Sequence, residues 1–71
     1  MYKWRINITL KGSGEIVCCK YEGYEKNPND VVGRLFSVAP STSFIMLNGL
    51  SNETHMFIVP SEIAAIEVRA V

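Results

Sequence analysis

Apolar and polar residues alternate over residues 2–10. A period of two is typical of a β-strand with one buried and one solvated face. The apolar face consists of Tyr2, Trp4, Ile6, Ile8 and Leu10, and the polar face consists of Lys3, Arg5, Asn7 and Thr9. We therefore expect this strand to face the core with its even-numbered residues.

Residues 11–14, Lys-Gly-Ser-Gly, predict a turn, because glycine reaches positive φ without steric cost. Residues 15–22 then predict a returning strand. With Ser13 and Gly14 at the tip, the expected pairs are Leu10 with Val17, Ile8 with Cys19, Ile6 with Tyr21, Asn7 with Lys20 and Arg5 with Glu22. This register matches apolar with apolar and cation with acid, whereas a slip of one residue would reverse the faces.

A polar connection leads from this hairpin into a predicted short helix that packs on one sheet face. Asn27 followed by Pro28 is typical of a helix N-cap and a first helical position. Apolar residues then recur at helical spacing through about Ser37, at Val31, Val32, Leu35 and Phe36. Pro40 and the run Ser-Thr-Ser at 41–43 are expected to end the helix.

The last third of the chain predicts three further strands. Residues 44–47 and 56–59 are apolar throughout, as expected of strands that are covered on both faces. Pro60 ends the second of these runs, because proline cannot donate to a sheet ladder. Residues 61–63 suit one tight turn, and residues 64–70 alternate again in a final strand.

The element order is therefore ββαβββ, within one small domain that spans residues 1–71. The expected fold class is α+β and predominantly antiparallel β. Five strands would form a small partly open barrel or a curved sheet with one short helix.

The two apolar strands present more apolar surface than so small a domain can cover. A chain of this size buries only about 60% of the surface that its unfolded form exposes, yet 48% of its 71 residues are hydrophobic. We therefore expect a non-enzymatic interaction or assembly module that self-associates as a dimer or higher oligomer, or meets another protein. The candidate interface residues are Phe44, Ile45, Met46, Leu47, Met56, Phe57, Ile58 and Val59.

Charge gives little reason to expect nucleic acid as a partner. Seven Lys and Arg residues balance seven Asp and Glu residues, so no overall field attracts a polyanion or an anionic membrane. No run approaches the roughly 18 apolar residues that span a bilayer. The local exception is a candidate anion face on the first hairpin, formed by Lys3, Arg5, Lys11 and Lys20. Binding of nucleic acid or a nucleotide there is the alternative function.

No catalytic, metal or cofactor motif stands out. Cys18 and Cys19 are neighbours that point to opposite faces of a strand, so they are poorly placed to bridge each other, which favours a reducing, cytoplasmic setting. His55 is the single histidine and lacks zinc-type companions. A thiolate–imidazole pair would need an exposed, activated cysteine. The glycine turn at 11–14 joins two antiparallel strands, unlike a phosphate-binding loop. We expect neither an enzyme nor a cofactor.

Residues 54–69 resemble the closing segment of SH3-like and Sm-like small barrels, in which a strand runs through one tight turn into a last strand. The apolar positions that carry the resemblance are Ile58, Ile63, Ile66 and Val68. The resemblance implies a small barrel, whereas a helix between the second and third strands departs from the Sm-like order, so an open five-stranded sheet with a helix on one face is the alternative. The whole chain is also similar in style to short bacterial and phage proteins.

Overall fold

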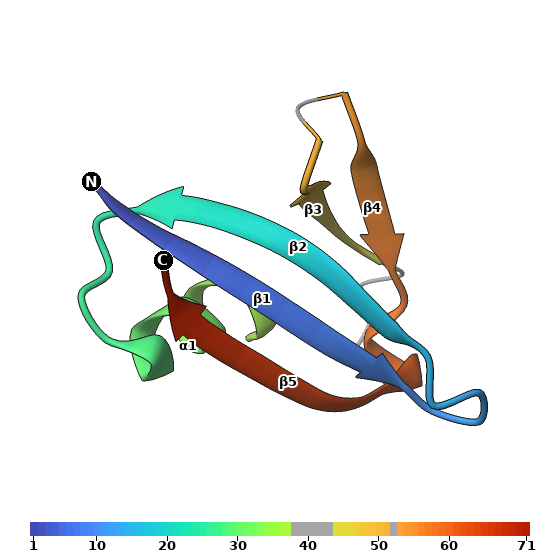
Figure 1. The fold of residues 1–71 in the computed structure, drawn as a ribbon. Helices are drawn as coiled ribbons and strands as arrows, with labels where there is room; N and C mark the ends of the chain where they lie inside the picture. The colour runs from blue at the N-terminus through green and yellow to red at the C-terminus, as the bar shows by residue number, and fades with distance from the viewer. Residues whose placement is uncertain (38–43, 52) are drawn as a thin grey trace.

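The computed structural model describes residues 1–37, 44–51 and 53–71 of the chain (Figure 1). Its elements are β1 (Tyr2–Leu10), β2 (Ile16–Gly23), α1 (Pro28–Phe36), β3 (Ile45–Gly49), β4 (His55–Ile58), the 3-10 turn η1 (Pro60–Glu62) and β5 (Ile63–Ala70). This order confirms the predicted ββαβββ arrangement. The tight turn expected before the last strand is present as η1.

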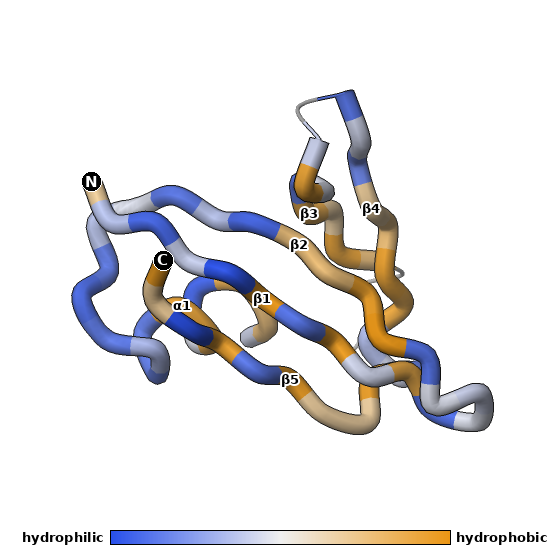
Figure 2. The backbone as a smooth tube through the Cα atoms, in the orientation of Figure 1, coloured by the Kyte–Doolittle hydropathy of each residue, from blue (hydrophilic) through white to orange (hydrophobic). Residues whose placement is uncertain are grey.

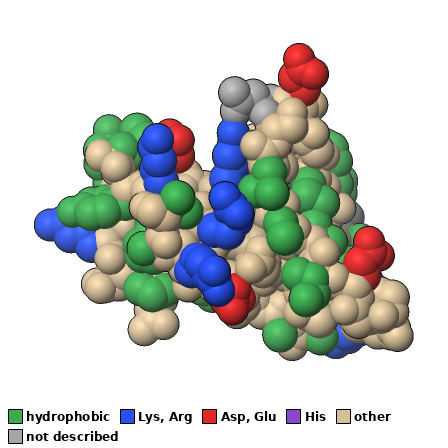
Figure 3. Space-filling model, in the orientation of Figure 1, with side chains coloured by type: hydrophobic (Ala, Val, Ile, Leu, Met, Phe, Trp, Pro, Cys, Tyr) green, Lys and Arg blue, Asp and Glu red, His purple; other side chains and the backbone are tan. Residues whose placement is uncertain are grey.

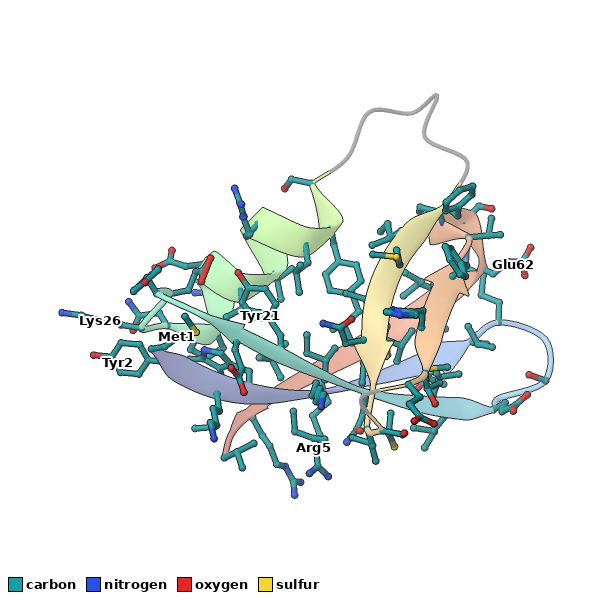
Figure 4. All side chains as sticks on the ribbon, turned by 90° about the horizontal axis from the view of Figure 1, so that it is seen from above. Met1, Tyr2, Arg5, Tyr21, Lys26 and Glu62 are labelled. Carbon is teal, nitrogen blue, oxygen red and sulfur yellow. The ribbon has the colours of Figure 1, made fainter. Side chains whose placement is uncertain are left out.

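Within the described residues, five strands form one antiparallel sheet in the order β4-β3-β2-β1-β5. In the part of the chain that the structure describes, β2 is joined to β3 by two residue pairs alone, Cys19 with Gly49 and Lys20 with Asn48. Figure 4 shows the β3–β4 hairpin turned toward the side of the long strands on which α1 lies. The sheet is therefore strongly curved, but it is not closed, because β4 and β5 are its two edges.

The β1–β2 hairpin has the expected faces but not the expected register. Ile8 lies opposite Val17 and Arg5 opposite Lys20, a shift of two residues from the prediction. The chain turns earlier than expected, with positive φ angles of 80° at Gly12 and 69° at Gly14. A shift of two changes every cross-strand partner yet leaves each side chain on its own face, because the side-chain period is also two.

The core lies between the sheet and the two elements that fold over it. Figure 2 shows the alternation of polar and apolar residues along β1, and the apolar residues of this strand from Trp4 to Ile8 are buried. The buried side chains come from β1, β2, α1 and the β3–β4 hairpin: Trp4, Ile6, Ile8, Cys19, Val31, Ile45, Leu47 and Ile58. One apolar cluster thus ties the hairpin and the helix to the long strands.

The helix begins where the sequence predicts. Asn27 is extended and precedes Pro28, and its carbonyl accepts the amide of Val31 at 3.3 Å, although its side chain makes no capping bond. The helix ends at Phe36, and the side chain of Val31 is fully buried. The predicted stop at Pro40 and residues 41–43 lies outside the described residues.

Glu25 fastens the connection between β2 and α1 to the sheet. Its carbonyl oxygen accepts a hydrogen bond from Trp4 Nε1 at 3.2 Å, and its carboxylate accepts one from Tyr21 Oη at 2.8 Å. The hydrogen bond to Glu25, together with burial, raises the pKa of Tyr21, and the same bond lowers the pKa of the Glu25 carboxyl group.

The Tyr21–Glu25 bond predicts the sign of two pH effects. The stability that the bond contributes through Tyr21 is fully present below the ordinary phenol pKa, and it is lost as the pH rises through the raised pKa. The stability that the bond contributes through Glu25 is fully present above the ordinary carboxyl pKa, and it is lost as the pH falls through the lowered pKa. We expect Glu25→Gln to move the pKa of Tyr21 back toward the ordinary phenol value in an NMR titration. An unchanged Tyr21 titration would contradict the bond.

Candidate functional site

The face of the sheet that points away from α1, here called the outer face, carries an exposed apolar patch on the β3–β4 hairpin. The patch consists of Phe44, Met46, Phe57 and Val59, which are 54%, 55%, 62% and 47% exposed. Figure 3 shows hydrophobic side chains gathered over β3 and β4 on this face. Exposure of this extent leaves a cluster of large side chains without cover from the described part of the chain.

Four of the eight residues of the predicted interface are exposed in the structure. Ile45, Leu47 and Ile58 are 8%, 4% and 5% exposed and belong to the core, and Met56 is partly buried against it. They therefore cannot contact another molecule without opening the core. Each of the two apolar strands has two apolar faces, as expected, but the inner face belongs to the protein's own core.

The aromatic rings of the patch are in contact with each other. Phe44 and Phe57 meet edge to face, with ring centroids 5.5 Å apart and an angle of 79° between the planes. Met46 lies directly opposite Phe57 in the β3–β4 ladder. Three of the four side chains of the patch therefore lie next to one another.

An open apolar hollow adjoins this patch where β4 approaches the β1–β2 hairpin. Its volume is about 240 Å³, and its walls include Leu10, Val17, Phe57 and Val59. Phe57 and Val59 therefore border both the hollow and the patch. The two features form one continuous apolar region at the edge of the sheet.

The backbone of β4 is also available at this edge. The Gly49 amide donates to the Thr54 carbonyl at 2.8 Å, which makes Gly49 and Thr54 a hydrogen-bonded pair. Because such pairs alternate along an antiparallel ladder, Met56 bonds toward β3, whereas the backbone groups of His55 and Phe57 point to the open edge. Water or an added strand can pair with these groups.

A second feature of the outer face is a row of positive side chains that crosses three strands. Arg5 of β1 lies directly between Arg69 of β5 and Lys20 of β2, and we call these three residues the cationic row. The row continues through Asn48 of β3 to His55 of β4. Figure 4 shows Arg5 pointing away from α1, and Figure 3 shows Lys and Arg side chains gathered across the middle of this face.

The row differs from the anion face predicted from the sequence. The two-residue shift of the hairpin places Glu22 opposite Lys3 rather than Arg5. Lys11 lies in the turn after β1, outside the paired strands. Arg69, which sequence reasoning did not include, takes its place because β5 pairs with β1.

The structure does not bring the candidate catalytic residues together. Cys18 is exposed and lies opposite Asn7, whereas His55 lies opposite Asn48, two strands away from β2. Burial, with a smaller effect of Cys18, raises the pKa of the buried Cys19 thiol, which disfavours the reactive thiolate. Cys19 Sγ instead contacts Met56 Sδ at 3.6 Å across the core.

The described residues contain no group of three or more His, Cys, Asp and Glu side chains placed to hold a metal ion. Nor does any helix in that part of the chain have the length and apolar character needed to cross a membrane. Comparisons with protein-family models, with curated proteins and with solved structures found no match to this chain.

Proposed function

We propose that this protein is a non-enzymatic assembly module that associates with a second copy of itself through the apolar patch and the β4 edge. The observation that carries the proposal is the exposure of Phe44, Met46, Phe57 and Val59 next to an edge strand that has one neighbouring strand among the described residues. A contiguous apolar surface beside a free edge is characteristic of association sites.

A second copy fits this surface better than a charged partner. The patch itself carries no charge, so an identical patch is a suitable counterpart. A two-fold dimer brings the same surface of each copy together. If β4 pairs antiparallel with its counterpart about an axis at Phe57, that residue lies opposite its own copy. The backbone groups of His55 and Phe57 then gain partners, and the two aromatic rings gain apolar contact.

The size of the protein sets how much contact the dimer needs. A standard interface covers about 800 Å² of each partner, which is roughly a sixth of the 4906 Å² accessible surface of this chain. Four side chains do not supply that area alone. The adjacent hollow of about 240 Å³ and the β4 backbone contribute the remainder in the proposed arrangement.

The proposal also accommodates the resemblance of residues 54–69 to SH3-like and Sm-like barrels. In this chain η1 leads from the edge strand β4 to the opposite edge strand β5. We infer a small-barrel relative whose sheet remains open, so that the β4 edge is left for a second copy.

Light scattering coupled to size-exclusion chromatography tests the proposal. The unaltered protein is expected to be a dimer at micromolar concentration, and Phe57→Ser is expected to be a monomer with an unchanged circular dichroism spectrum. Tyr24→Ser is the matched control, because Tyr24 is an aromatic residue that is 79% exposed in the connection between β2 and α1. It should remain a dimer.

Two results would overturn self-association. One is a monomeric unaltered protein at micromolar concentration. The other is a Phe57→Ser variant that dimerises as strongly as the Tyr24→Ser control, since the contact would then lie elsewhere.

A further inference from the structure

We propose that the cationic row of Arg69, Arg5 and Lys20 binds a ligand that carries consecutive phosphate groups, such as a nucleic-acid strand or a polyphosphate. The site lies on the outer face, next to but separate from the apolar patch. It is therefore independent of self-association, and its test uses different residues.

The first support is an arrangement that the fold alone does not favour. Like charges directly opposite each other in a sheet are destabilising, yet Arg5 has Arg69 on one side and Lys20 on the other. An anion bound across the row would relieve this repulsion. Residues that cost stability are often those retained for binding.

The second support is that Arg5, at the centre of the row, has no acidic partner among the described residues. Glu67 Oε1 accepts a hydrogen bond from Asn7 Nδ2 at 2.8 Å and forms an ion pair with Arg69 at 3.5 Å. Glu22 lies opposite Lys3. Among the described residues, Arg5 forms no ion pair, and its buried Nε atom has no hydrogen-bond partner. The central guanidinium of the row therefore keeps donors available for a ligand.

The third support is the shape of the surface around the row. Beyond the pair Lys20–Asn48, β2 and β3 separate and leave an open hollow of about 330 Å³ whose walls include Lys20 and Glu22. A second hollow of about 230 Å³ is lined in part by Lys3, Arg5 and Lys20. The cations thus border concave surface that a ligand can enter.

The spacing of the row indicates several phosphates rather than one. Neighbouring strands lie about 4.8 Å apart, so the row from Arg69 to Lys20 spans about 10 Å. Along the axis of a nucleic-acid duplex, each strand carries a phosphate about every 3.4 Å, so more than one phosphate falls within that length. A chain of phosphates can contact the three side chains where they leave the sheet, whereas a single phosphate group would require all three to converge on one point.

Fluorescence anisotropy with a labelled oligothymidylate tests the site, with tripolyphosphate and inorganic phosphate as competitors. The unaltered protein is expected to bind with a slope of about −2 for log K against log salt, as three contacts to a single strand would give. Arg5→Gln should weaken binding about tenfold, because it removes charge-assisted hydrogen bonds. Lys11→Gln, which removes the same charge outside the row, should change binding less than twofold.

The competitors identify the source of the phosphates. If the oligonucleotide binds and tripolyphosphate competes, the row recognises phosphate chains in general. If tripolyphosphate does not compete, a nucleic-acid strand is the ligand. If the oligonucleotide does not bind and calorimetric titration detects tripolyphosphate binding, a polyphosphate is the ligand. Inorganic phosphate at equal concentration should displace neither.

The proposal fails if the unaltered protein binds neither polyanion at low salt. It fails equally if Arg5→Gln and Lys11→Gln weaken binding to the same extent, because binding would then depend on total charge. Arg69→Gln is the second variant should Arg5→Gln unfold, since the Arg69 side chain is 66% exposed and its loss leaves the core intact. Its binding should fall severalfold, and unchanged binding by a folded Arg69→Gln protein would exclude the row.

Discussion

Trp4→Ala is expected to lower the free energy of unfolding by about 3–5 kcal/mol, the range for deleting a large buried aromatic side chain. Trp4 is only 6% exposed and belongs to the core cluster. Its indole Nε1 also donates to the Glu25 carbonyl, so the substitution leaves this acceptor without its donor as well as creating a cavity. The free energy of unfolding of a native protein is only about 5–15 kcal/mol. We therefore expect the variant to be largely unfolded in mild urea.

Urea titration followed by far-ultraviolet circular dichroism measures this effect, since Trp4 is the single tryptophan and cannot report on its own removal. Trp4→Phe is the control. It keeps most of the apolar volume and loses the N–H group, so it should cost about 0.5–1.5 kcal/mol beyond the change in packing. A Trp4→Ala protein as stable as the unaltered one would show that β1 does not present its even-numbered residues to the core.

The two faces of β1 could be predicted from the sequence because alternation is a local property. Each residue of a strand points opposite to its neighbour, whatever the partner strands are. Cross-strand partners are different, because they depend on where the chain turns. Glycines at 12 and 14 permit more than one loop, and the loop that forms is centred one residue earlier than expected, which shifts the pairing by two residues. The pairing of Arg5 with Glu22 was therefore wrong although both faces were right.

The apolar patch could be predicted only in part. Residues 44–47 and 56–59 contain no polar residue, so the runs themselves have no alternation that tells the inner face from the outer one. The nearest signal is Asn48, which follows Met46 by two residues and must share its face. Since an exposed polar residue marks the solvent side, Asn48 could have assigned Met46 to the outside and Leu47 to the core.

The cationic row depends on information that no local pattern contains. Arg5 and Arg69 are neighbours only because β5 pairs with β1, and the segments are separated by almost the whole chain. In the alternating segment 64–70, Arg69 falls among the polar residues of an amphipathic strand, and nothing in that pattern selects its partner. Strand order, rather than composition, places the charges together.

The distinction between the inner and outer faces of β3 leads to the second large effect. Leu47 is 4% exposed and packs in the core, whereas its neighbour Met46 is 55% exposed in the apolar patch. Leu47→Ala is expected to lower the free energy of unfolding by about 2–5 kcal/mol, because the cavity left in the core cannot fully collapse. Met46→Ala removes a similar volume from the surface and should change the free energy of unfolding of the monomer by no more than about 0.5 kcal/mol.

The same two variants should have the opposite order of effect on association. Met46→Ala removes apolar contact from the proposed interface and should weaken the dimer, whereas a folded fraction of Leu47→Ala retains the patch unchanged. Urea unfolding must be measured below the concentration at which the dimer forms, because association adds to apparent stability. Equal destabilisation by both substitutions would mean that Met46 is also part of the core, and the outer face of the hairpin would no longer be available to a second copy.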